Sequence, residues 1–485
     1  MDNNYALSGK SKLSYALGAV GKDMVYMLSA SYVLYYFQDL LGVSAIAMGV
    51  ILMAARVFDA FNDPIMGVIV AKTKTRWGKF RPWLLIGTVT NAVILFLMFA
   101  APPTLKGSGL VAYAAIFYIL WGVTYTMMDI PYWSMIPAFT QGGKERENLT
   151  TLARTCAGVG SAIITIVTMM IVPMLGKMLG GVEGNAGEIV GFKYFSLIVA
   201  ALFVLFTLLM CINIKERSTV EMETVSVGQM FKALVQNDQA MTVTLAIVLI
   251  NTAVYITSNL VIYFFKYDFG GTGWNSAYVL FNMFGGGIQV LSMMAFYPLL
   301  RRKFTSLQIF YICLGMAMAG YAVLLALAFT NMSNVFLLFV PGFFIFAANG
   351  MLTVITTVFL ANTVDYGELK NDRRDESVIF SMQTFVVKLA SGIAALAASI
   401  CLSINHLQSG TDVSEADKVH DFSAAVSLGQ KTGLRMTMTV IPIIGLLIAF
   451  FWFRKKFILD EAKVEEITAA VKAKHSKNAE ALKQS

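Results

Sequence analysis

The sequence predicts an all-α membrane protein with about twelve transmembrane helices. Of its 485 residues, 57% are hydrophobic and 14% are charged, whereas a soluble domain carries about 25% charged residues. Apolar stretches of about 20 residues recur along the chain, and this is the length that a helix needs to cross a bilayer core. Backbone groups cannot stay unpaired in lipid, so such segments form helices or a closed barrel. The sequence lacks the alternating pattern of barrel strands, which favours helices.

The apolar stretches fall into two sets of six, separated by a polar segment. The first set is predicted at residues 13–41, 44–71, 83–101, 109–139, 149–175 and 191–213. The second set is predicted at residues 239–267, 273–300, 305–329, 335–361, 377–404 and 431–454. The predicted domains are therefore a first bundle (1–213), a cytoplasmic central linker (214–238), a second bundle (239–454) and a cytoplasmic tail (455–485).

Basic residues gather in alternate loops, which predicts the orientation of the chain. The loops after the second, eighth and tenth helices carry these residues: Lys72, Lys74, Arg76, Lys79, Arg81, Arg301, Arg302, Lys303, Lys370, Arg373 and Arg374. Because Lys and Arg accumulate in cytoplasmic loops, we expect both termini and the central linker in the cytoplasm, with the chain in the cell inner membrane. The same rule accounts for the net charge of +8 without nucleic acid.

Several other functions are disfavoured by composition. The four cysteines lie in apolar stretches, where they are expected to be reduced core residues and not a disulfide framework. The three histidines are scattered, so neither a resident metal cluster nor a cofactor is expected. The sequence shows no grouping of Ser, Cys or His that would support an enzyme. The polar start of the chain lacks a signal-peptide pattern, so insertion should begin with the first helix.

Charged residues inside apolar helices are the strongest functional signal. An ionisable side chain in a membrane helix costs a few kcal/mol on insertion scales, and it is therefore expected to face the protein interior and to act in function. These residues are Lys22, Asp23, Arg56, Asp59, Asp63, Asp129, Arg154 and Lys388. Most of them fall in the first four predicted helices.

The second predicted helix carries two carboxylates that could hold a coupling ion. Asp59 and Asp63 are four residues apart and share one helix face, with Asn62 between them. Two carboxylates on adjacent turns repel each other unless they share a cation or a proton. This pattern predicts a site for Na⁺ or H⁺. The alternative is a structural ion pair, in which Arg56 or another cation neutralises one aspartate.

The fourth predicted helix carries a pattern that suits a sugar. Thr126, Asp129 and Trp133 lie on one face at helical spacing, and Pro131 can kink the helix near them. A carboxylate accepts hydrogen bonds from sugar hydroxyls, and an aromatic face covers the apolar side of the ring. Arg154 and Lys388 could donate to sugar hydroxyls or pair with the aspartates. The alternative for Trp133 is an anchor at the membrane interface.

The two sets of helices echo each other faintly. Residues 141–147 and 370–376 are charged loops of similar composition, and the helices that follow them carry the single cations Arg154 and Lys388. Parallel six-helix repeats with a site between them are a transporter architecture.

At these residues the chain resembles the glycoside–pentoside–hexuronide:cation symporters of the major facilitator superfamily, and among them the melibiose permeases. The matching stretches are Gly21–Asp23, Ala55–Gly67, Arg76–Trp83, Leu120–Trp133 and Thr363–Glu368. The likeness covers the whole chain, densely over about the first 155 residues. It implies the major facilitator fold and symport of a sugar with Na⁺, Li⁺ or H⁺.

The resemblance also implies roles for individual residues. It implies a cation site formed by Asp59, Asn62, Asp63 and Thr126. It implies sugar contacts from Lys22, Asp23, Tyr125, Asp129, Trp133 and Arg154. Lys388 would support both sites and balance charge, together with Arg56.

One departure from the melibiose permeases bears on the substrate. They carry a tryptophan in the tenth helix, where this chain has Thr353. Acidic sugars would be repelled by Asp23 and Asp129. We therefore expect a neutral galactoside such as melibiose or a related oligosaccharide. The alternatives are another glycoside, a pentoside or a glucuronide, or proton-driven export of amphipathic compounds. The expected partners are this sugar, the cation and membrane lipid.

Overall fold

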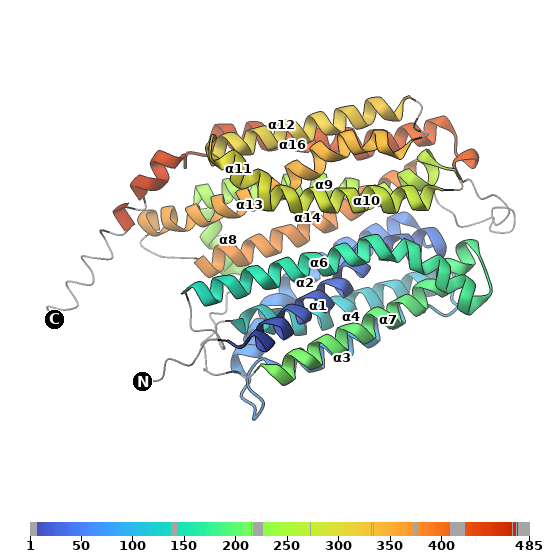
Figure 1. Cartoon of the computed structure of the whole chain (residues 1–485), viewed down its shortest axis with the longest axis horizontal. Helices are drawn as coiled ribbons and strands as arrows, with labels where there is room; N and C mark the ends of the chain where they lie inside the picture. The colour runs from blue at the N-terminus through green and yellow to red at the C-terminus, as the bar shows by residue number, and fades with distance from the viewer. Residues whose placement is uncertain are drawn as a thin grey trace. The chain divides into compact units, whose positions relative to one another are not determined.

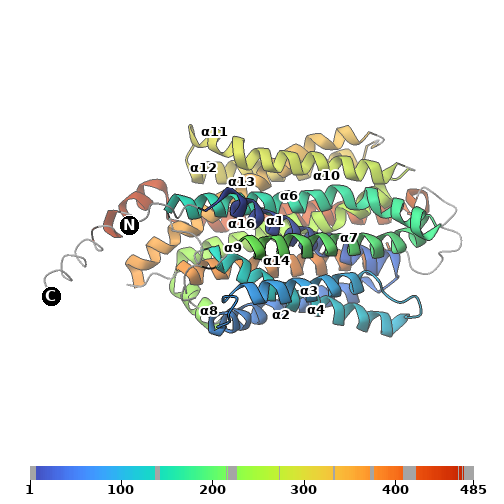
Figure 2. The ribbon, with the colours of Figure 1, turned by 60° about the horizontal axis from the view of Figure 1, so that its bottom comes forward.

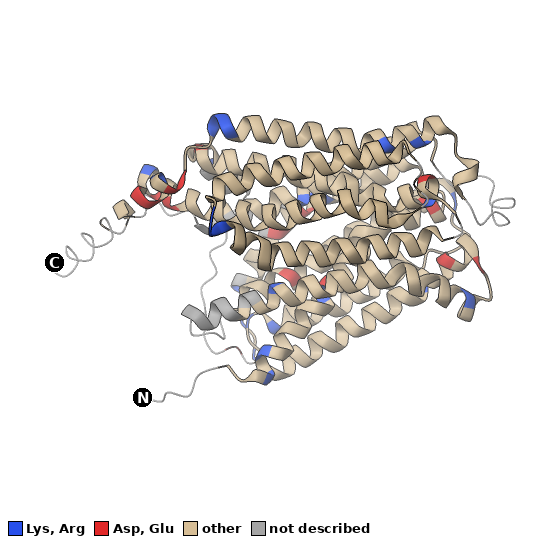
Figure 3. Cartoon of the chain, turned by 45° about the horizontal axis from the view of Figure 1, so that its top comes forward, with Lys and Arg blue, Asp and Glu red and all other residues tan. Residues whose placement is uncertain are grey.

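The computed structural model is an assembly of long helices (Figure 1). It describes residues 7–136, 143–214, 216, 227–271, 273–330, 332, 334–371, 376–407, 422–467, 469–471 and 473. No strand occurs among these residues, which confirms the predicted all-α class. Most charged residues lie near helix ends, and the long helices are largely uncharged along their length (Figure 3).

The first set of long helices follows the predicted ranges closely. It comprises α1 (Gly9–Leu34) with its continuation η1 (Tyr35–Leu40), α2 (Ala45–Lys72), α3 (Arg81–Met98), α4 (Gly107–Ser134), α6 (Gly143–Leu175) with η2 (Gly176–Gly180), and α7 (Gly184–Asn213). The η1 and η2 segments are π-helical turns.

The second set also matches its predicted ranges. It comprises α9 (Asp238–Tyr263) with η3 (Phe264–Phe269), α10 (Trp274–Leu291) with η4 (Ser292–Phe296) and α11 (Tyr297–Arg301), α12 (Ser306–Ala328), α13 (Val335–Asn371), α14 (Glu376–Ile404) and α16 (Leu428–Lys456). A short 3₁₀ turn, η5 (Phe422–Ala425), precedes α16.

Eleven helices of the described chain are long and apolar enough to cross a membrane. The helix outside this set is α1, whose 26 residues are long enough to span. Its charged residues, Lys22 and Asp23 among them, lower its mean hydropathy. The same two charged residues belong to the predicted sugar site.

The central linker, predicted as a polar segment, contains the helix α8 (Val227–Gln236). One predicted range was wrong. The tenth predicted helix was expected to end at 361, whereas α13 continues to Asn371. Polar residues in this extension lowered the hydropathy but did not interrupt the backbone hydrogen bonds of the helix.

Described residues of the charged tail form a helix that packs on α13. Residues 461–467 are helical, and Leu459, Ile467 and Val471 form a small core with Tyr366 and Leu369. The part of the tail that the structure describes is therefore an amphipathic segment.

The chain divides into two compact units that do not coincide with the two sets of helices. The first unit contains Met1–Thr224, Phe265–Met283 and Ala395–Lys431, and the second contains Val225–Phe264, Phe284–Ala394 and Thr432–Ser485. The first unit thus combines the first six long helices with end segments of helices from the second set. The predicted domain boundaries remain a prediction.

Within the first unit, α1 packs against α6 and α7, while α4 packs against α2 and α3. Figure 2 shows α3 and α4 side by side. Two glycines permit close approaches of α1 and α4 to their neighbours: a Cβ on Gly160 of α6 would lie 2.3 Å from the Val20 carbonyl oxygen of α1, and one on Gly87 of α3 would lie 2.8 Å from the Met128 nitrogen of α4. This packing fixes α1 and α4 next to the residues that carry the charges. Within the second unit, α13 packs against α9 and α12.

Candidate functional site

Four helices of the first unit carry nearly all the predicted site residues. Lys22 and Asp23 lie on α1, and the α2 residues are Arg56, Asp59, Asn62 and Asp63. The remaining residues are Tyr125, Thr126, Asp129 and Trp133 on α4 and Arg154 on α6. The structure brings these residues together in two groups, one around Lys22 and one around Asp59 and Asp63.

Lys22 is the centre of the first group. Its Nζ lies 2.7 Å from Asp129 Oδ1 and 3.1 Å from Asp23 Oδ2, and it donates a hydrogen bond to the Tyr125 hydroxyl at 3.1 Å. Only 4% of Lys22 is exposed. Because a buried ammonium is tolerated only with anionic partners, the two carboxylates and the lysine depend on each other for their charged state.

A tryptophan closes one side of this group. The Arg154 guanidinium carbon lies 3.9 Å from the centre of the Trp133 ring, and Lys22 Nζ lies 5.2 Å from it. Such cation–π contacts hold the ring in place. The tryptophan is therefore part of the charged group, which argues against the alternative of an interfacial anchor.

Paired tyrosines fix α1 against α4 beside this group. The Tyr15 hydroxyl donates to the Tyr132 carbonyl oxygen at 2.6 Å, and the Tyr132 hydroxyl donates to the Tyr15 carbonyl oxygen at 2.8 Å. Their rings stack with centres 4.5 Å apart. These reciprocal bonds set the register that brings Lys22 opposite Asp129.

One buried acceptor in the group has unused hydrogen-bonding capacity. Asp23 Oδ2 is within ion-pair distance of Lys22, yet among the described residues it accepts no hydrogen bond. A buried carboxylate oxygen without a donor is costly. It is a suitable acceptor for the hydroxyl of a ligand.

The second group holds the two α2 carboxylates in different environments. Arg56 donates to Asp59 Oδ2 at 3.3 Å, and the two side chains are 4% and 6% exposed. Asp63 Oδ1 accepts a hydrogen bond from Thr126 Oγ1 at 2.9 Å. Asp59 therefore forms the ion pair with Arg56 that the sequence left open as an alternative. Asp63 instead binds Thr126, the threonine of the predicted cation site.

Asn62 and Gly122 complete this second group. Asn62 Nδ2 is buried and has no hydrogen-bond partner among the described residues, and a Cβ on Gly122 would lie 2.7 Å from Asp59 Oδ1. The glycine therefore permits α4 to approach the Asp59 carboxylate. Among the described residues, no three His, Cys, Asp or Glu side chains gather as a metal site. A cation here would need the amide and hydroxyl oxygens as well.

The prediction missed an aromatic column between the two groups. Tyr118, Trp121 and Tyr125 stack along α4, with ring centres 5.8 and 5.3 Å apart. Tyr26 of α1 packs against Tyr125. The guanidinium carbon of Arg56 lies 5.9 Å from the centre of the Tyr26 ring. Tyr125 was a predicted sugar contact, whereas Tyr118 and Trp121 were not predicted. The spacing of the three aromatics by three and four residues is the sequence signal for this column.

Two predicted residues, Lys388 and Thr353, lie in the second unit. Lys388 lies on α14 and is half buried, and its supporting role stays a prediction. Thr353 lies on α13, where its hydroxyl donates to the Asn349 carbonyl oxygen at 2.9 Å. The effect of this threonine on specificity also stays a prediction.

The basic loop before α3 is held by an acidic residue from the central linker. The Glu216 carboxylate accepts hydrogen bonds from the backbone N–H groups of Lys79, Phe80 and Arg81 at 2.6, 3.0 and 3.0 Å. Backbone N–H groups at the start of a helix need acceptors from outside the helix, and a negative charge there is favourable. The linker is thereby tied to the first unit at one point.

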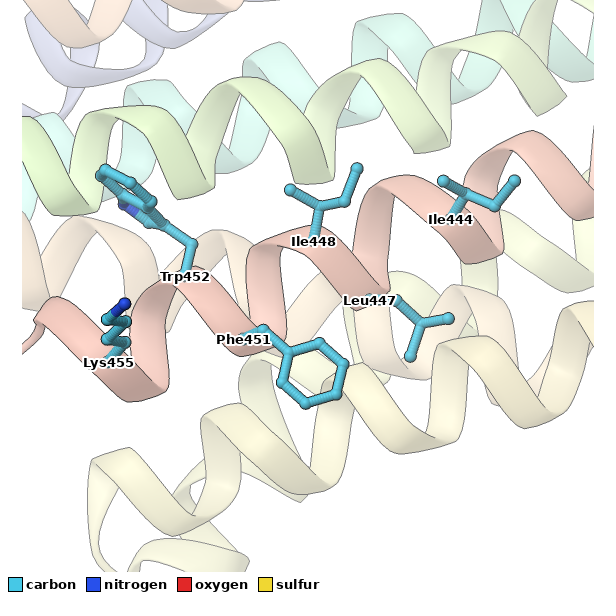
Figure 4. A pocket seen from close by; sticks show the side chains of 6 residues that line it. All are labelled: Ile444, Leu447, Ile448, Phe451, Trp452 and Lys455. Carbon is cyan, nitrogen blue, oxygen red and sulfur yellow. The ribbon is translucent and has the colours of Figure 1, made fainter.

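A groove on α16 does not resemble a sugar site. Its volume is about 410 Å³, and it is lined by Ile444, Leu447, Ile448, Phe451, Trp452 and Lys455, all from one helix (Figure 4). The groove carries one charged group and no acceptor for a hydroxyl. The polar groups that could bind a sugar lie instead on α1 and α4.

The chain matches the family model described as MFS/sugar transport protein over residues 14–461. This match covers every helix that carries a predicted site residue. It agrees with the family resemblance that the motifs indicated.

Curated relatives match most of the chain at low identity. A lactose permease of Lactobacillus delbrueckii subsp. bulgaricus is 27% identical, over 94% of this chain and 71% of the relative. A raffinose carrier protein of Pediococcus pentosaceus is 26% identical, over 96% and 72%. An isoprimeverose transporter of Lactiplantibacillus pentosus is 28% identical, over 82% of each chain.

A solved structure with the same fold is a bacterial homolog of the human lysosomal transporter Spinster, in an inward-facing and unoccupied conformation. The match covers 92% of this chain and 95% of the solved chain, with a TM-score of 0.64 and 12% identity. This likeness supports the major facilitator fold.

Proposed function

We propose that this chain, which belongs to the MFS/sugar transport protein family, imports a neutral glycoside together with a coupling cation. The family members that it matches are membrane transporters and not enzymes. The observation that carries the proposal is the buried group of Lys22, Asp23 and Asp129 beside Trp133, in which Asp23 Oδ2 accepts no hydrogen bond from the described residues.

The sugar would bind to the Lys22 group. Asp23 Oδ2 is available to accept a hydroxyl, and Asp129 and Lys22 supply a second acceptor and a donor. Hydrogen bonds to charged groups are worth about 1.5–3 kcal/mol each. Trp133 would cover the apolar side of a pyranose ring. This set of groups discriminates by hydroxyl position, as sugar recognition requires.

The cation would bind near Asp59 and Asp63. Two carboxylates one helical turn apart repel each other, and a Na⁺, Li⁺ or H⁺ shared between them would relieve this repulsion. Asn62 and Thr126 would add oxygen ligands, which hard cations prefer.

Coupling would pass through α4, because both sites use it. Thr126 contacts Asp63, while its neighbour Tyr125 contacts Lys22. A cation that orders Thr126 therefore also orders the start of the sugar group. By linkage, the sugar must raise cation affinity by the same factor.

A neutral galactoside, such as melibiose or a related oligosaccharide, is the favoured substrate. Asp23 and Asp129 would repel an acidic sugar, and two curated relatives are described as carriers of lactose and raffinose. The second candidate is another glycoside or pentoside, since a third relative is described as an isoprimeverose transporter. Export of amphipathic compounds is disfavoured by the density of carboxylates in the site.

The favoured location is the cell inner membrane with both termini in the cytoplasm. The basic loops between α2 and α3 and after α11 support this orientation. We call the end of α1 that lies away from its N-terminus the far end, and this orientation places the far end toward the periplasm.

Calorimetry on the purified protein tests the proposed substrate class. We expect galactosides to bind, with affinity raised at least about fivefold by Na⁺ or Li⁺ or by a change in pH, in keeping with the usual range of coupling. A panel of galactosides, glucosides, pentosides and glucuronides provides the comparison. Heat of binding from glucuronides alone would overturn the neutral-sugar assignment.

Replacement of Gly122 by alanine tests the cation site separately. Its new Cβ would lie 2.7 Å from Asp59 Oδ1, so the carboxylate or the helix must shift. We expect apparent cation affinity in transport assays to fall about tenfold, equivalent to about 1.4 kcal/mol. The matched control is Gly158→Ala on α6, where a Cβ meets nothing within 4 Å. Equal cation affinities for the two variants would contradict the assigned site.

A further inference from the structure

A completely buried ion pair lies at the far end of the first unit. Lys266 Nζ of η3 lies 2.5 Å from Asp39 Oδ2 of η1, and the two side chains are 1% and 0% exposed. The Tyr267 hydroxyl also donates to Asp39. None of these residues belongs to the sugar or cation groups.

Aromatic and acidic neighbours surround the pair. Lys266 Nζ donates to the Tyr35 hydroxyl at 3.3 Å, and this hydroxyl donates to Glu188 Oε2 at 2.7 Å. The Phe422 ring lies 4.5 Å from Lys266 Nζ. Lys266 is thus paired directly with Asp39 and is linked to the buried Glu188 carboxylate through the Tyr35 hydroxyl.

The pair joins elements from the two sets of six helices. Asp39 lies on η1, which continues the first helix of the first set, and Lys266 lies on η3, which continues the first helix of the second set. Both segments are six-residue π-helices, and each is followed by a glycine with positive φ, Gly42 at 73° and Gly271 at 78°. Such π-helical turns are rare and often occur at functional sites.

The ion pair has two stable states, one closed and one open, and the state between them is unfavourable. Either the ions are buried against each other, or the far end opens and water solvates both. Separation without water would leave uncompensated charges in the interior. Alternating access in secondary transporters requires one repeat to move against the other, and any such movement at the far end must break this pair.

We propose that the Asp39–Lys266 pair, with Tyr267, is the gate that keeps the far end of the transport path closed. The proposal rests on the proposed transport function for its purpose. It identifies a role for residues that contact neither sugar nor cation.

The test is the labelling rate of a cysteine placed beside the gate, in purified protein in lipid nanodiscs. The reporter is Gln38→Cys, since Gln38 is 0% exposed and has no hydrogen-bond partner among the described residues. A soluble maleimide reaches both sides of a nanodisc, so the result does not depend on orientation. The chain without the reporter measures the background from its native cysteines.

We expect Lys266→Gln and Asp39→Asn each to raise the labelling rate at least tenfold, because each leaves a buried group without its partner. The double variant removes both members of the ion pair together, so neither is left buried without the other, and its rate should fall back toward that of the parent. The control is Lys177→Gln, which breaks the Lys177–Glu183 pair of 2.8 Å, whose side chains are 71% and 63% exposed. This control should label like the parent.

Equal labelling of Lys266→Gln and Lys177→Gln would overturn the proposal. If the single charge variants fail to fold, Tyr267→Phe decides, since it removes one hydroxyl and keeps both charges. We expect it to label about threefold faster than the parent, and an unchanged rate would overturn the gate. Labelling requires no sugar or cation, so failure of the proposed function would leave this result interpretable.

Discussion

Replacement of Asp129 by asparagine is expected to weaken sugar binding at least about 100-fold. The carboxylate lies 2.7 Å from Lys22 Nζ, and its loss leaves Asp23 as the other carboxylate paired with this buried lysine. Hydrogen bonds to a charged group contribute about 1.5–3 kcal/mol each. Loss of the charge would weaken the two hydrogen bonds that the Asp129 carboxylate can accept from sugar hydroxyls. Calorimetry with the best-binding galactoside measures the change directly.

Tyr125→Phe is the matched control for this prediction. It removes the hydroxyl that accepts from Lys22 at 3.1 Å and keeps the ring that stacks on Trp121. The lost bond comes from a charged donor, and such bonds contribute about 1.5–3 kcal/mol. Because Lys22 keeps Asp23 and Asp129 as partners, we expect a loss of about tenfold or less. If Asp129→Asn bound sugar as well as Tyr125→Phe does, Asp129 would not be a sugar contact.

Replacement of Asp59 by asparagine is expected to abolish cation-driven accumulation of sugar. The variant keeps the volume of the side chain and an oxygen that can accept from Arg56, whose contact is now 3.3 Å. It loses the charge that attracts the cation. The sugar group around Lys22 remains intact, so the variant should still bind sugar. Its sugar uptake should be equal in energised and in de-energised vesicles.

Glu183→Gln provides the control for this charge removal. Glu183 forms an exposed pair with Lys177, and exposed pairs contribute about 0–1 kcal/mol. Its accumulation of sugar should match that of the parent. An Asp59→Asn variant that still concentrated sugar under a cation gradient would exclude Asp59 from coupling.

Helix positions were predictable because apolar length is a strong signal in a membrane protein. The weak points were segments where polar residues continue a helix, as in α8 and the end of α13. Hydropathy registers the polarity of such residues, whereas the backbone hydrogen bonds that define a helix are independent of it. The π-helical ends of α1 and α9 could not be predicted from hydropathy either, because they depend on how these helices pack.

Helical spacing placed Asp59 and Asp63 on one face of α2. The pairing of Thr126 with Asp63 was implied by the family resemblance alone, and the structure joins the two residues by a hydrogen bond. The choice of Arg56 as the partner of Asp59 was left open, because spacing allows it without requiring it. Asp39 and Lys266 were missed because they lie at the ends of predicted helices, where a charge is usually exposed at the interface.

The account depends on a cation that stabilises the α2 carboxylates and thereby favours sugar binding through α4. The most direct test titrates Na⁺ into purified protein with and without a saturating sugar, for the parent and for Asp59→Asn. We expect the sugar to raise cation affinity in the parent by the same factor by which the cation raises sugar affinity, and we expect no cation binding in the variant. Identical cation affinity in the presence and absence of sugar would contradict the account, as would unchanged cation binding after the substitution.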